Sequence, residues 1–252
     1  MSKVIAIANQ KGGVGKTTTS QAFGMGLVAQ GKKVLFVDLD QQLSLSYILG
    51  APRTQHTIYD VLVNRTDTKT AILHLDGFDL LPAHSELAKA DMVINELGKE
   101  YRLKEALAPI RNNYDFIVID CPPNLNILTI AALVSADDVI IPAQADVLSV
   151  MGIQAFKGTF DVIRRYSNSK LNIAGILLCR HNTRTNLTRE FTELVEDVAK
   201  SIGTKVFNTT IREAIKVREA QSLRLNLLEY APNSTVAEDY RALVNEYLNG
   251  GK

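Results

Sequence analysis

Short hydrophobic runs alternate with longer amphipathic stretches along the whole chain. The run Phe116–Ile119 is apolar at every position, which is typical of a parallel strand covered by helices on both faces. The longer stretches have the 3.6-residue periodicity of helices. We expect strands over Val4–Ala8, Lys33–Val37, Asp79–Leu81, Phe116–Ile119, Val139–Pro142, Ile173–Leu178 and Lys205–Phe207, and helices over Thr17–Gln30, Ser85–Leu97, Arg102–Arg111, Leu125–Ser135, Ile153–Tyr166, Leu187–Ser201 and Val236–Leu248.

Strands and helices alternate from one end of the chain to the other, which predicts an α/β fold with a doubly wound, mostly parallel sheet flanked by helices. No internal repeat, low-complexity segment or Pro/Gly/Ser-rich linker interrupts the pattern, so we expect a single domain over residues 1–252. The periodicity is weakest over Gln41–Leu75. We expect an irregular segment there, after the second strand, that is able to move.

The composition is that of an ordinary globular protein, with 46% hydrophobic and 22% charged residues, and it excludes a disordered or fibrous chain. The net charge of +1 excludes a basic surface over the whole protein but leaves room for a local one. Cys121 and Cys179 lie far apart with no CxxC spacing, which disfavours a disulfide framework or a zinc site. No apolar run is long enough to span a bilayer and no signal peptide is present, so we expect a cytoplasmic protein that does not bind membranes.

The segment QKGGVGKTT, Gln10–Thr18, directly follows the first expected strand and begins the first expected helix. Its glycines allow backbone N–H groups to approach phosphate oxygens, and the helix N-terminus adds a favourable field. In such a loop Lys16 reaches the β- and γ-phosphates and the Thr17 hydroxyl binds Mg²⁺. The strict GxxxxGK[ST] pattern is not met, because Gln10 replaces its first glycine and a second lysine, Lys11, lies inside the loop. The segment predicts a phosphate-binding loop and a fold of the P-loop NTPase type.

With its extra lysine, this loop resembles the deviant Walker A motif of the ParA/MinD family of ATPases. Three later segments are similar to family motifs in the same order: VDLDQQ at 37–42, with Gln41 where proline is usual, IDCPP at 119–123, and IPAQAD at 141–146, with Asp146 in place of glutamate. The last third of the chain, from Thr183 to Tyr240, resembles the Soj-like ParA proteins of chromosomes and plasmids. The order and spacing of these motifs are together specific.

The resemblance implies an ATPase with ATP and Mg²⁺ as cofactors. Phosphoryl transfer depends mainly on positioning and charge neutralisation, and the matching residues divide these tasks between them. Thr17 is expected to bind Mg²⁺ directly, with Asp120 acting through water and Asp38 supporting the metal site, and Asp40 is expected to orient the attacking water. The expected phosphate-binding residues are Lys11, Gly12, Gly13, Val14, Gly15, Lys16, Thr17 and Thr18, and the expected catalytic residues are Lys11, Lys16 and Asp40.

Lys11 implies a second copy of the chain. In this family the signature lysine crosses a nucleotide-sandwich dimer and contacts the phosphates of the other subunit, where it neutralises charge. We therefore expect ATP to drive formation of a homodimer and hydrolysis to release it. Intrinsic turnover should be slow and stimulated by a partner, because a switch must persist long enough to act.

Positive charge is concentrated between Lys157 and Glu229, with 13 Lys and Arg against 8 Asp and Glu. Taken alone, this surplus is typical of a solvated surface. No helix-turn-helix, zinc finger or aromatic stacking pattern accompanies it, so the expected contacts are with phosphates and not with base edges. Soj-like proteins bind nonspecific DNA through basic residues in this region, and Arg189 and Arg218 stand at matching positions. The candidate contacts with double-stranded DNA are Arg184, Arg189, Lys216, Arg218 and Arg224.

These features favour an ATP-dependent dimer that coats the bacterial nucleoid and segregates a chromosome or plasmid with a ParB-like, centromere-bound partner. A MinD-like positioning ATPase is an alternative, but it needs a basic amphipathic helix at the C-terminus, and Ala237–Leu248 carries three acidic residues and one arginine. An ATP-switched regulatory binding module is another. The cargo, the stimulating partner and the effect of Gln41 are left open. So are the adenine contacts, because the family's IPR turn reads Thr210-Ile211-Arg212 here.

Overall fold

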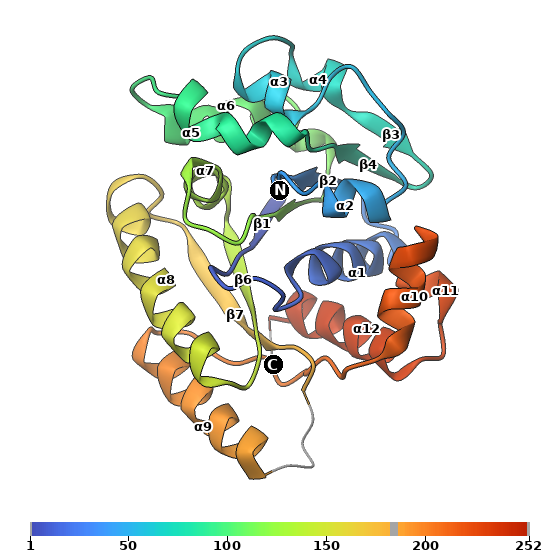
Figure 1. The fold of residues 1–252 in the computed structure, drawn as a ribbon, viewed down its shortest axis with the longest axis vertical. Helices are drawn as coiled ribbons and strands as arrows, with labels where there is room; N and C mark the ends of the chain where they lie inside the picture. Colours follow the sequence, from blue (N-terminus) through green and yellow to red (C-terminus); the bar gives the residue numbers. More distant parts are fainter. Residues whose placement is uncertain (1, 182–185, 251–252) are drawn as a thin grey trace.

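A central seven-stranded sheet organises the computed structural model, which describes residues 2–181 and 186–250 (Figure 1). The strand order is β3-β4-β2-β5-β1-β6-β7, with β3 antiparallel to β4 and every other neighbouring pair parallel. This confirms the predicted doubly wound, mostly parallel sheet. The strands are β1 (Lys3–Ile7), β2 (Val34–Asp38), β3 (Leu73–Leu75), β4 (Phe78–Leu81), β5 (Phe116–Asp120), β6 (Asp138–Ala143) and β7 (Asn172–Leu178).

Helices cover both faces of the sheet (Figure 1). One face carries α1 (Lys16–Ala29), α2 (Ser44–Ile48), α10 (Ile215–Leu223), α11 (Leu227–Tyr230) and α12 (Thr235–Leu248). The other face carries α3 (Ile58–Leu62), α4 (Thr68–Ala71), η1 (Ser85–Lys89), α5 (Ala90–Val93), η2 (Lys99–Tyr101), α6 (Arg102–Leu107), η3 (Arg111–Asn113), α7 (Ile127–Ser135), α8 (Val147–Tyr166) and α9 (Asn186–Ser201), where η marks short 3-10 helices. Among the described helices, none is both long and apolar enough to cross a lipid bilayer.

The strands separate two hydrophobic cores because successive side chains point to opposite faces. In β1, Val4 and Ala6 belong to the core under α7 and α8, whereas Ile5 and Ile7 belong to the core under α1 and α12. All four side chains are buried. A central strand flanked by helices on both faces therefore reads as a continuous apolar run, as the sequence pattern predicts.

Helix α1 lies unusually close to its neighbours because two of its residues have no side chain. A Cβ atom at Gly24 would lie 2.2 Å from Cε1 of Phe36 in β2, and one at Gly26 would lie 2.8 Å from Cγ2 of Val244 in α12. Real Cβ atoms essentially never lie this close to another atom, so a side chain at either position would force Phe36, Val244 or the helix itself to shift. Since α1 begins at Lys16, this close packing fixes the start of the helix relative to the sheet.

Four features of the structure differ from the expectations. The helix expected over Ser85–Leu97 is broken into η1 and α5, and the backbone leaves helical geometry at Ile94. Lys205–Phe207 forms a single bridge from Val206 to β7, not a strand. The irregular stretch Gln41–Leu75 contains three short helices and the edge strand β3, whose few residues have too little periodicity to be recognised. Helix α10 was not expected, because its exposed face carries Ile215 and Leu223 and breaks the amphipathic pattern.

Candidate nucleotide-binding site

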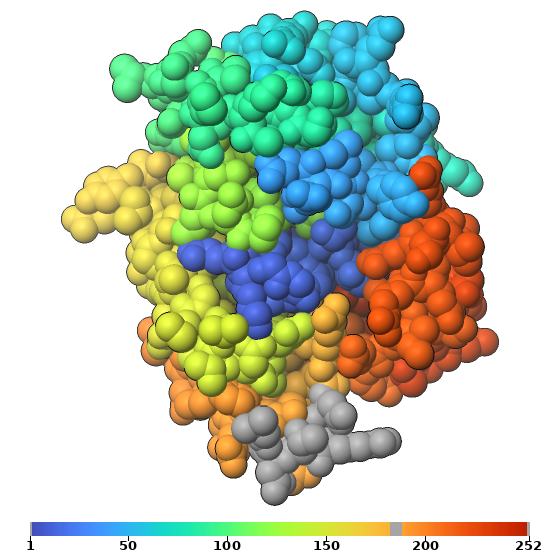
Figure 2. Space-filling model, viewed as in Figure 1, coloured from blue at the N-terminus to red at the C-terminus, as the bar shows by residue number. Residues whose placement is uncertain are grey.

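The glycine-rich loop connects β1 to α1 at the carboxyl ends of the central strands, where ligands bind in open α/β sheets. Gly13 and Gly15 have φ angles of 72° and 98°, which a residue with a side chain rarely adopts. In Figure 2 the dark blue atoms of this loop are exposed at the centre of the face, between α2 and the orange atoms of α10. The loop borders a cavity of about 790 Å³, lined by Gly12, Gly13, Gly15, Lys16, Thr17, Thr18, Asp40, Gln42, Leu43, Ser44, Tyr47, Ile48, Pro123, Arg180, Gln221 and Ser222.

Lys16 is the buried cation of the loop. Its Nζ donates a hydrogen bond of 2.9 Å to the carbonyl oxygen of Lys11, so the side chain curls over the loop. Burial lowers the pKa of Lys16, while the negative charges of Asp120 and Asp40 act in the opposite direction. A phosphate group in the cavity would supply the anionic partner that a buried ammonium requires.

Thr17 and Asp120 form the oxygen-rich side of the site. The Thr17 hydroxyl donates to Oδ2 of Asp120 at 2.8 Å, and the Ser20 hydroxyl donates to Oδ1 at 2.8 Å. Burial, reinforced by the neighbouring charge of Asp38, raises the pKa of Asp120 to about 8. A hydroxyl and a carboxylate are the ligand types that Mg²⁺ prefers, and a divalent cation would offset the buried negative charge. Thr17 and Asp120 therefore fit the predicted metal site.

The described residues contain no group of three or more His, Cys, Asp or Glu side chains that could enclose a metal ion. A magnesium ion at Thr17 and Asp120 would complete its coordination with phosphate oxygens and water, as Mg²⁺ commonly does in nucleotide sites. The site is therefore suited to a metal that arrives with a nucleotide.

Asp38 and Asp40 shape the segment that follows β2. Asp38 is fully buried, and its Oδ2 accepts hydrogen bonds of 2.7 Å from both the backbone and the hydroxyl of Ser46, while Oδ1 accepts from the Asp40 backbone at 3.1 Å. Burial raises the pKa of Asp38 to about 6. These contacts make Asp38 the residue that fastens α2 to the end of β2, and its role in the metal site stays a prediction.

Asp40 lines the cavity, and its role in orienting the attacking water stays a prediction. Its Oδ1 accepts a hydrogen bond of 3.0 Å from the backbone of Gln42, and Oδ2 makes no hydrogen bond within the described part of the chain. This oxygen can accept a proton or hydrogen bond from a water molecule near the phosphates. The turn ends at Leu43, whose φ of 57° is a left-handed conformation.

Lys11 lies at the rim and points away from Lys16. Its Nζ donates to Oδ2 of Asp146 at 2.6 Å and approaches the Ser149 hydroxyl at 3.4 Å. Asp146 is the N-cap of α8, because its Oδ1 accepts from the Ser149 backbone at 2.8 Å. Partial burial opposes ionisation of Asp146, but the hydrogen bonds from Lys11 and Ser149 outweigh it and lower the pKa of Asp146 below its usual range. Sequence reasoning missed this ion pair, although the position of Asp146 just before a helix was a usable signal.

Comparison with known proteins decides the family. The family described as an AAA domain matches residues 2–173. The chain is 38% identical over 256 residues to the sporulation initiation inhibitor protein Soj of Bacillus subtilis, with 100% of both chains covered. It is 36% identical over 254 residues to the chromosome partitioning protein ParA of Caulobacter vibrioides, with 98% of this chain and 94% of the other covered. The chain belongs to the ParA/Soj family of P-loop ATPases.

A solved structure extends this similarity to three dimensions. The cobyrinic acid a,c-diamide synthase of Mycobacterium smegmatis, with bound ADP and magnesium, matches with a TM-score of 0.85 and 33% identity, covering 100% of this chain and 97% of the other. The sequence-based resemblance and the fold of the P-loop NTPase type are thus confirmed. These relatives are named for different roles, from chromosome partitioning to cobyrinic acid a,c-diamide synthesis, so similarity alone does not assign one of these roles to this ParA/Soj family member.

The basic residues expected to contact DNA are dispersed. Arg184 lies outside the described residues. Arg189 is exposed in the first turn of α9 and Arg218 is exposed on α10, and within the described part of the chain neither makes an ion pair. Figure 1 shows α9 and α10 in separate parts of the molecule. One copy of this ParA/Soj chain therefore does not bring all the candidate residues into a single patch.

Two of the candidate DNA contacts already have partners. Lys216 forms an ion pair of 2.8 Å with Glu219 and lies 5.7 Å from the ring centre of Tyr230. The Arg224 guanidinium lies 4.0 Å from the ring centre of Tyr47, which belongs to α2 at the rim of the cavity. Arg224 is thus held against the nucleotide site, a placement that sequence spacing does not reveal.

Sequence reasoning also missed residues of α10 and of the end of β7. The Gln221 amide donates to the Thr18 hydroxyl at 2.9 Å, and so joins α10 to the first turn of α1. Arg180 lines the main cavity and, together with Arg218, a smaller one of about 160 Å³ beside it. No local signal pointed to Gln221, because α10 itself was not expected.

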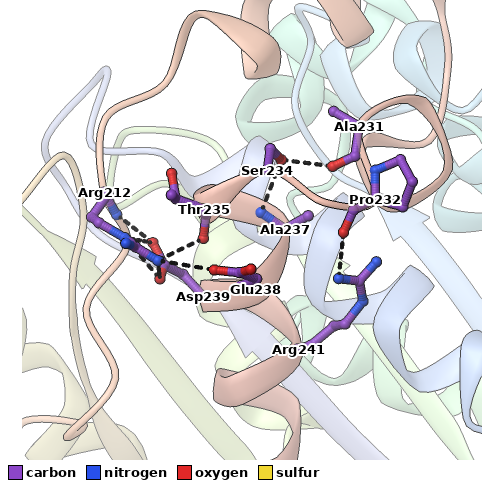
Figure 3. A network of polar contacts seen from close by, with 9 residues as sticks. All are labelled: Arg212, Ala231, Pro232, Ser234, Thr235, Ala237, Glu238, Asp239 and Arg241. Carbon is purple, nitrogen blue, oxygen red and sulfur yellow. Dashed lines mark hydrogen bonds and ion pairs between the residues drawn. The ribbon is translucent and has the colours of Figure 1, made fainter.

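The segment that enters α10 is anchored on α12 (Figure 3). Arg212 makes hydrogen bonds with both carboxylate oxygens of Asp239, the shortest of 2.6 Å, and a further one with the Thr235 carbonyl. The Arg212 backbone also donates to Asp239 at 2.9 Å. Arg212 occupies the turn that matches the family's IPR motif, and here its side chain serves to hold this turn on α12.

Proposed function

We propose that this chain is an ATP-dependent, dimerising ATPase that binds double-stranded DNA without sequence preference and segregates a chromosome or plasmid with a ParB-like partner. The observation that carries the proposal is the different placement of the two loop lysines. Lys16 is buried over the loop, suited to the phosphates of its own site, whereas Lys11 lies outside on an exchangeable ion pair. The chromosome partitioning protein ParA of Caulobacter vibrioides and the chromosome-partitioning ATPase Soj of Treponema pallidum, each 36% identical to this chain, support this choice of function.

Within one subunit, the loop amides and Lys16 would hold the phosphates of ATP, and Thr17 with Asp120 would hold Mg²⁺. The ion, when bound, neutralises phosphate charge as it develops during transfer. Asp40 would accept a hydrogen bond from the attacking water through its unoccupied oxygen and so orient it. Turnover would be slow in the absence of a partner, because the single chain keeps Lys11 away from the phosphates.

The second subunit would complete the site through Lys11. Release of Lys11 from Asp146 leaves its ammonium available for the phosphates of the opposite copy, a charge-neutralising role of known catalytic value. Apolar side chains follow Asp146 in the first turns of α8, where Val147, Leu148 and Met151 are 53%, 65% and 60% exposed. Their burial between two copies would contribute the hydrophobic part of the association.

DNA binding would follow from dimerisation. Arg189 and Arg218 are exposed and unpaired in the described structure, as residues that contact a phosphate backbone must be. Two copies double the number of such contacts on one duplex, so a weak monomer becomes a much stronger dimer through effective concentration. ATP would in this way control affinity for DNA.

The test is binding of the full-length protein to random-sequence duplex DNA with ATP, with ADP and without nucleotide, repeated over a range of salt. We expect strong binding with ATP alone that weakens steeply with salt, with a log–log slope of about 0.9 per phosphate contacted. Absence of DNA binding under every condition, with ATP-dependent dimers still present, would contradict the proposal and favour a MinD-like positioning ATPase or a regulatory binding module.

A further inference from the structure

We propose that Gln21, Tyr47 and Arg224 form a junction that transmits the state of the nucleotide site to α10. The inference rests on the proposed function, because α10 carries Lys216 and Arg218, which are proposed to approach DNA. It adds a route within one subunit by which nucleotide affects DNA affinity, beyond the doubling of contacts in a dimer.

A single buried amide joins three elements. Gln21 of α1 is only 1% exposed, and its Nε2 donates to the carbonyl oxygen of Ile48 in α2 at 3.3 Å and to that of Leu225, just after α10, at 3.4 Å. Both carbonyls belong to chain segments that leave a helix end and need a donor. A change in the position of α2 therefore alters the hydrogen bonding of the turn that ends α10.

The Tyr47–Arg224 stack makes the second connection between α2 and α10. A guanidinium 4.0 Å from an aromatic ring centre is in direct contact with the ring face, where the electrostatic attraction is strongest. Arg224 caps α10 with a φ of 56°, a left-handed conformation in which glycine is usual. A residue with a side chain persists in this conformation where its surroundings hold it.

Left-handed residues other than glycine gather around this junction. Of four such residues in the described structure, Leu43 and Arg180 line the nucleotide cavity and Arg224 lies on its α10 side. Strained backbone positions of this kind cluster at sites that switch between conformations. Three of the four described positions of this kind thus lie at the nucleotide cavity or at the junction, each in a separate segment of the chain.

The position of α2 depends on the nucleotide site because hydrogen bonds join the helix to residues at the end of β2. Ser46 of α2 donates twice to Asp38 at the end of β2, and the Asp40–Leu43 turn leads directly into the helix. Atoms that bind next to Asp40 therefore act on α2 through a connection of only a few residues. On the other side, Gln221 links the last turns of α10 to Thr18 of the phosphate loop helix.

The segment that enters α10 is held on α12, at the end of the helix away from the junction. The paired hydrogen bonds from Arg212 to Asp239 anchor its entry on α12 (Figure 3). At 1.5 Å per residue, the nine residues of α10 span about 13 Å. A movement of its last turn at the junction is then a change in tilt, which redirects the exposed side chains of Lys216 and Arg218.

Substitution of Tyr47 tests the junction without changing the charge of the protein. Tyr47→Leu removes the ring face, whereas Tyr47→Phe keeps it and serves as the matched control. We expect the ratio of affinities for random duplex DNA in ATP and in ADP to fall about tenfold in Tyr47→Leu and to stay within about twofold in Tyr47→Phe. The affinity in ADP should stay within about twofold in both variants, which separates loss of coupling from loss of folding. Because Tyr47 lines the nucleotide cavity, each variant is measured at concentrations of ATP and ADP that saturate it, which separates loss of coupling from loss of nucleotide binding. A ratio unchanged in Tyr47→Leu would overturn the proposal.

A second measurement does not depend on DNA. Hydrogen–deuterium exchange of the α10 amides, with and without ATP and Mg²⁺, should change at least threefold in the unmodified protein and not in Tyr47→Leu. Exchange in α10 that ignores ATP in the unmodified protein would overturn the junction. If α10 responds through Tyr47 but no nucleotide state binds DNA, the junction stands and the proposed function fails.

Discussion

The phosphate site and the basic surface of this protein differ in how their residues are arranged. By the basic surface we mean the proposed DNA contacts Arg189 and Arg218. In the phosphate site, nine consecutive residues supply the loop, and Lys16, Thr17 and Asp120 each have a hydrogen-bonding partner within the chain. On the basic surface, Arg189 and Arg218 lie on two separate helices, exposed and without an ion pair among the described residues.

The difference matches the two ligands that we propose, a nucleotide phosphate and a DNA duplex. A small phosphate group is held by short, directed hydrogen bonds, so its site has to be specified to within a fraction of an ångström. A duplex is a repeating polyanion that responds to charge at many interchangeable points. Binding a phosphate group therefore requires a contiguous sequence motif, whereas binding a duplex requires only a surplus of positive charge.

The largest effect is expected at the centre of the phosphate site. Lys16→Ala should weaken ATP binding at least 100-fold, or about 2.7 kcal/mol, because it removes the buried cation that faces the phosphates. Calorimetric titration with ATP measures this directly. The matched control is Lys11→Ala, which should bind ATP within a few-fold of the unmodified protein and fail to dimerise. Equal loss of ATP affinity in both variants would contradict the separate roles of the two lysines.

The buried Asp120 carboxylate of the phosphate site should lower the free energy of unfolding when neither nucleotide nor metal is bound. Asp120 has a pKa of about 8 in the folded protein, against an ordinary value of 3.8. The folded state then binds the proton more tightly, so the free energy of unfolding falls as pH rises from about 4 to about 8. Asp120→Asn removes this dependence and should stabilise the ligand-free protein by about 2 kcal/mol at pH 8.5.

Urea unfolding at pH 4.5 and pH 8.5, without nucleotide or metal, measures the Asp120 effect. The two proteins should have similar stability at the lower pH. A gain of the same size at both pH values would mean that the substitution acts through packing and not through the buried charge.

A smaller effect, on dimerisation, is expected from the ion pair between Lys11 and Asp146 at the edge of the phosphate site. Asp146→Asn keeps the N-cap of α8 but weakens its hold on Lys11, whose release dimerisation is proposed to require. A partly exposed ion pair contributes less than about 1 kcal/mol, so ATP-dependent dimerisation should tighten about threefold. Sedimentation of the protein with ATP at several concentrations tests this. Weaker dimers would show that Asp146 itself is needed in the interface.

On the basic surface, one residue should matter little by itself. Arg218→Ala should weaken ATP-dependent DNA binding only a few-fold at moderate salt and lower the log–log salt slope by about 0.9 for each copy that contacts a phosphate. Asp197→Ala, which removes an exposed acid on α9, is a control for general charge effects, since it changes net charge by one unit in the other direction. Loss of all DNA binding in Arg218→Ala would mean that this surface is as tightly specified as the phosphate site.

The smallest effect on stability is expected at the border between the two regions. Arg224→Gly removes the strain of a left-handed residue with a side chain, but it also adds backbone freedom to the unfolded chain. Because these two contributions nearly cancel, the free energy of unfolding should change by about 1 kcal/mol or less. Thermal unfolding measures this change. The variant should nevertheless lower the ratio of DNA affinities in ATP and in ADP about tenfold, as Tyr47→Leu does, because the stack on Tyr47 is gone. A large destabilisation would instead assign Arg224 a purely structural role.

The same contrast explains what the sequence alone could predict. The strands β1, β2, β5 and β6 are buried on both faces, so their residues read as apolar runs and the sheet could be recognised. The loop before α1 was recognisable because its glycines and lysines are consecutive. Pairs such as Lys11 with Asp146 or Arg224 with Tyr47 join residues more than 130 positions apart, and no local pattern records them.

Exposed helices were the least predictable elements. Helix α10 places Ile215 and Leu223 in solvent, which removes the apolar stripe on which a helix prediction depends. For the segment after η1 the error is the opposite one, because a helix is predicted where the structure has little. Its composition suits a helix, but Met92 and Leu97 are exposed and the backbone leaves helical geometry at Ile94. In both segments tertiary packing decides the outcome over local preference.

Substitution of Gly24 should impair this protein although the residue lies outside the phosphate loop. It lies eight residues, or about 12 Å, along α1 from Lys16 and does not line the nucleotide cavity, yet an added methyl group would press on the buried Phe36 ring and push the helix away from the sheet. Because Lys16 and Thr17 belong to the same rigid helix, they would move with it, away from Asp120. Random mutagenesis for loss of activity should thus recover Gly24 alongside the phosphate loop, even though this residue takes no part in the chemistry.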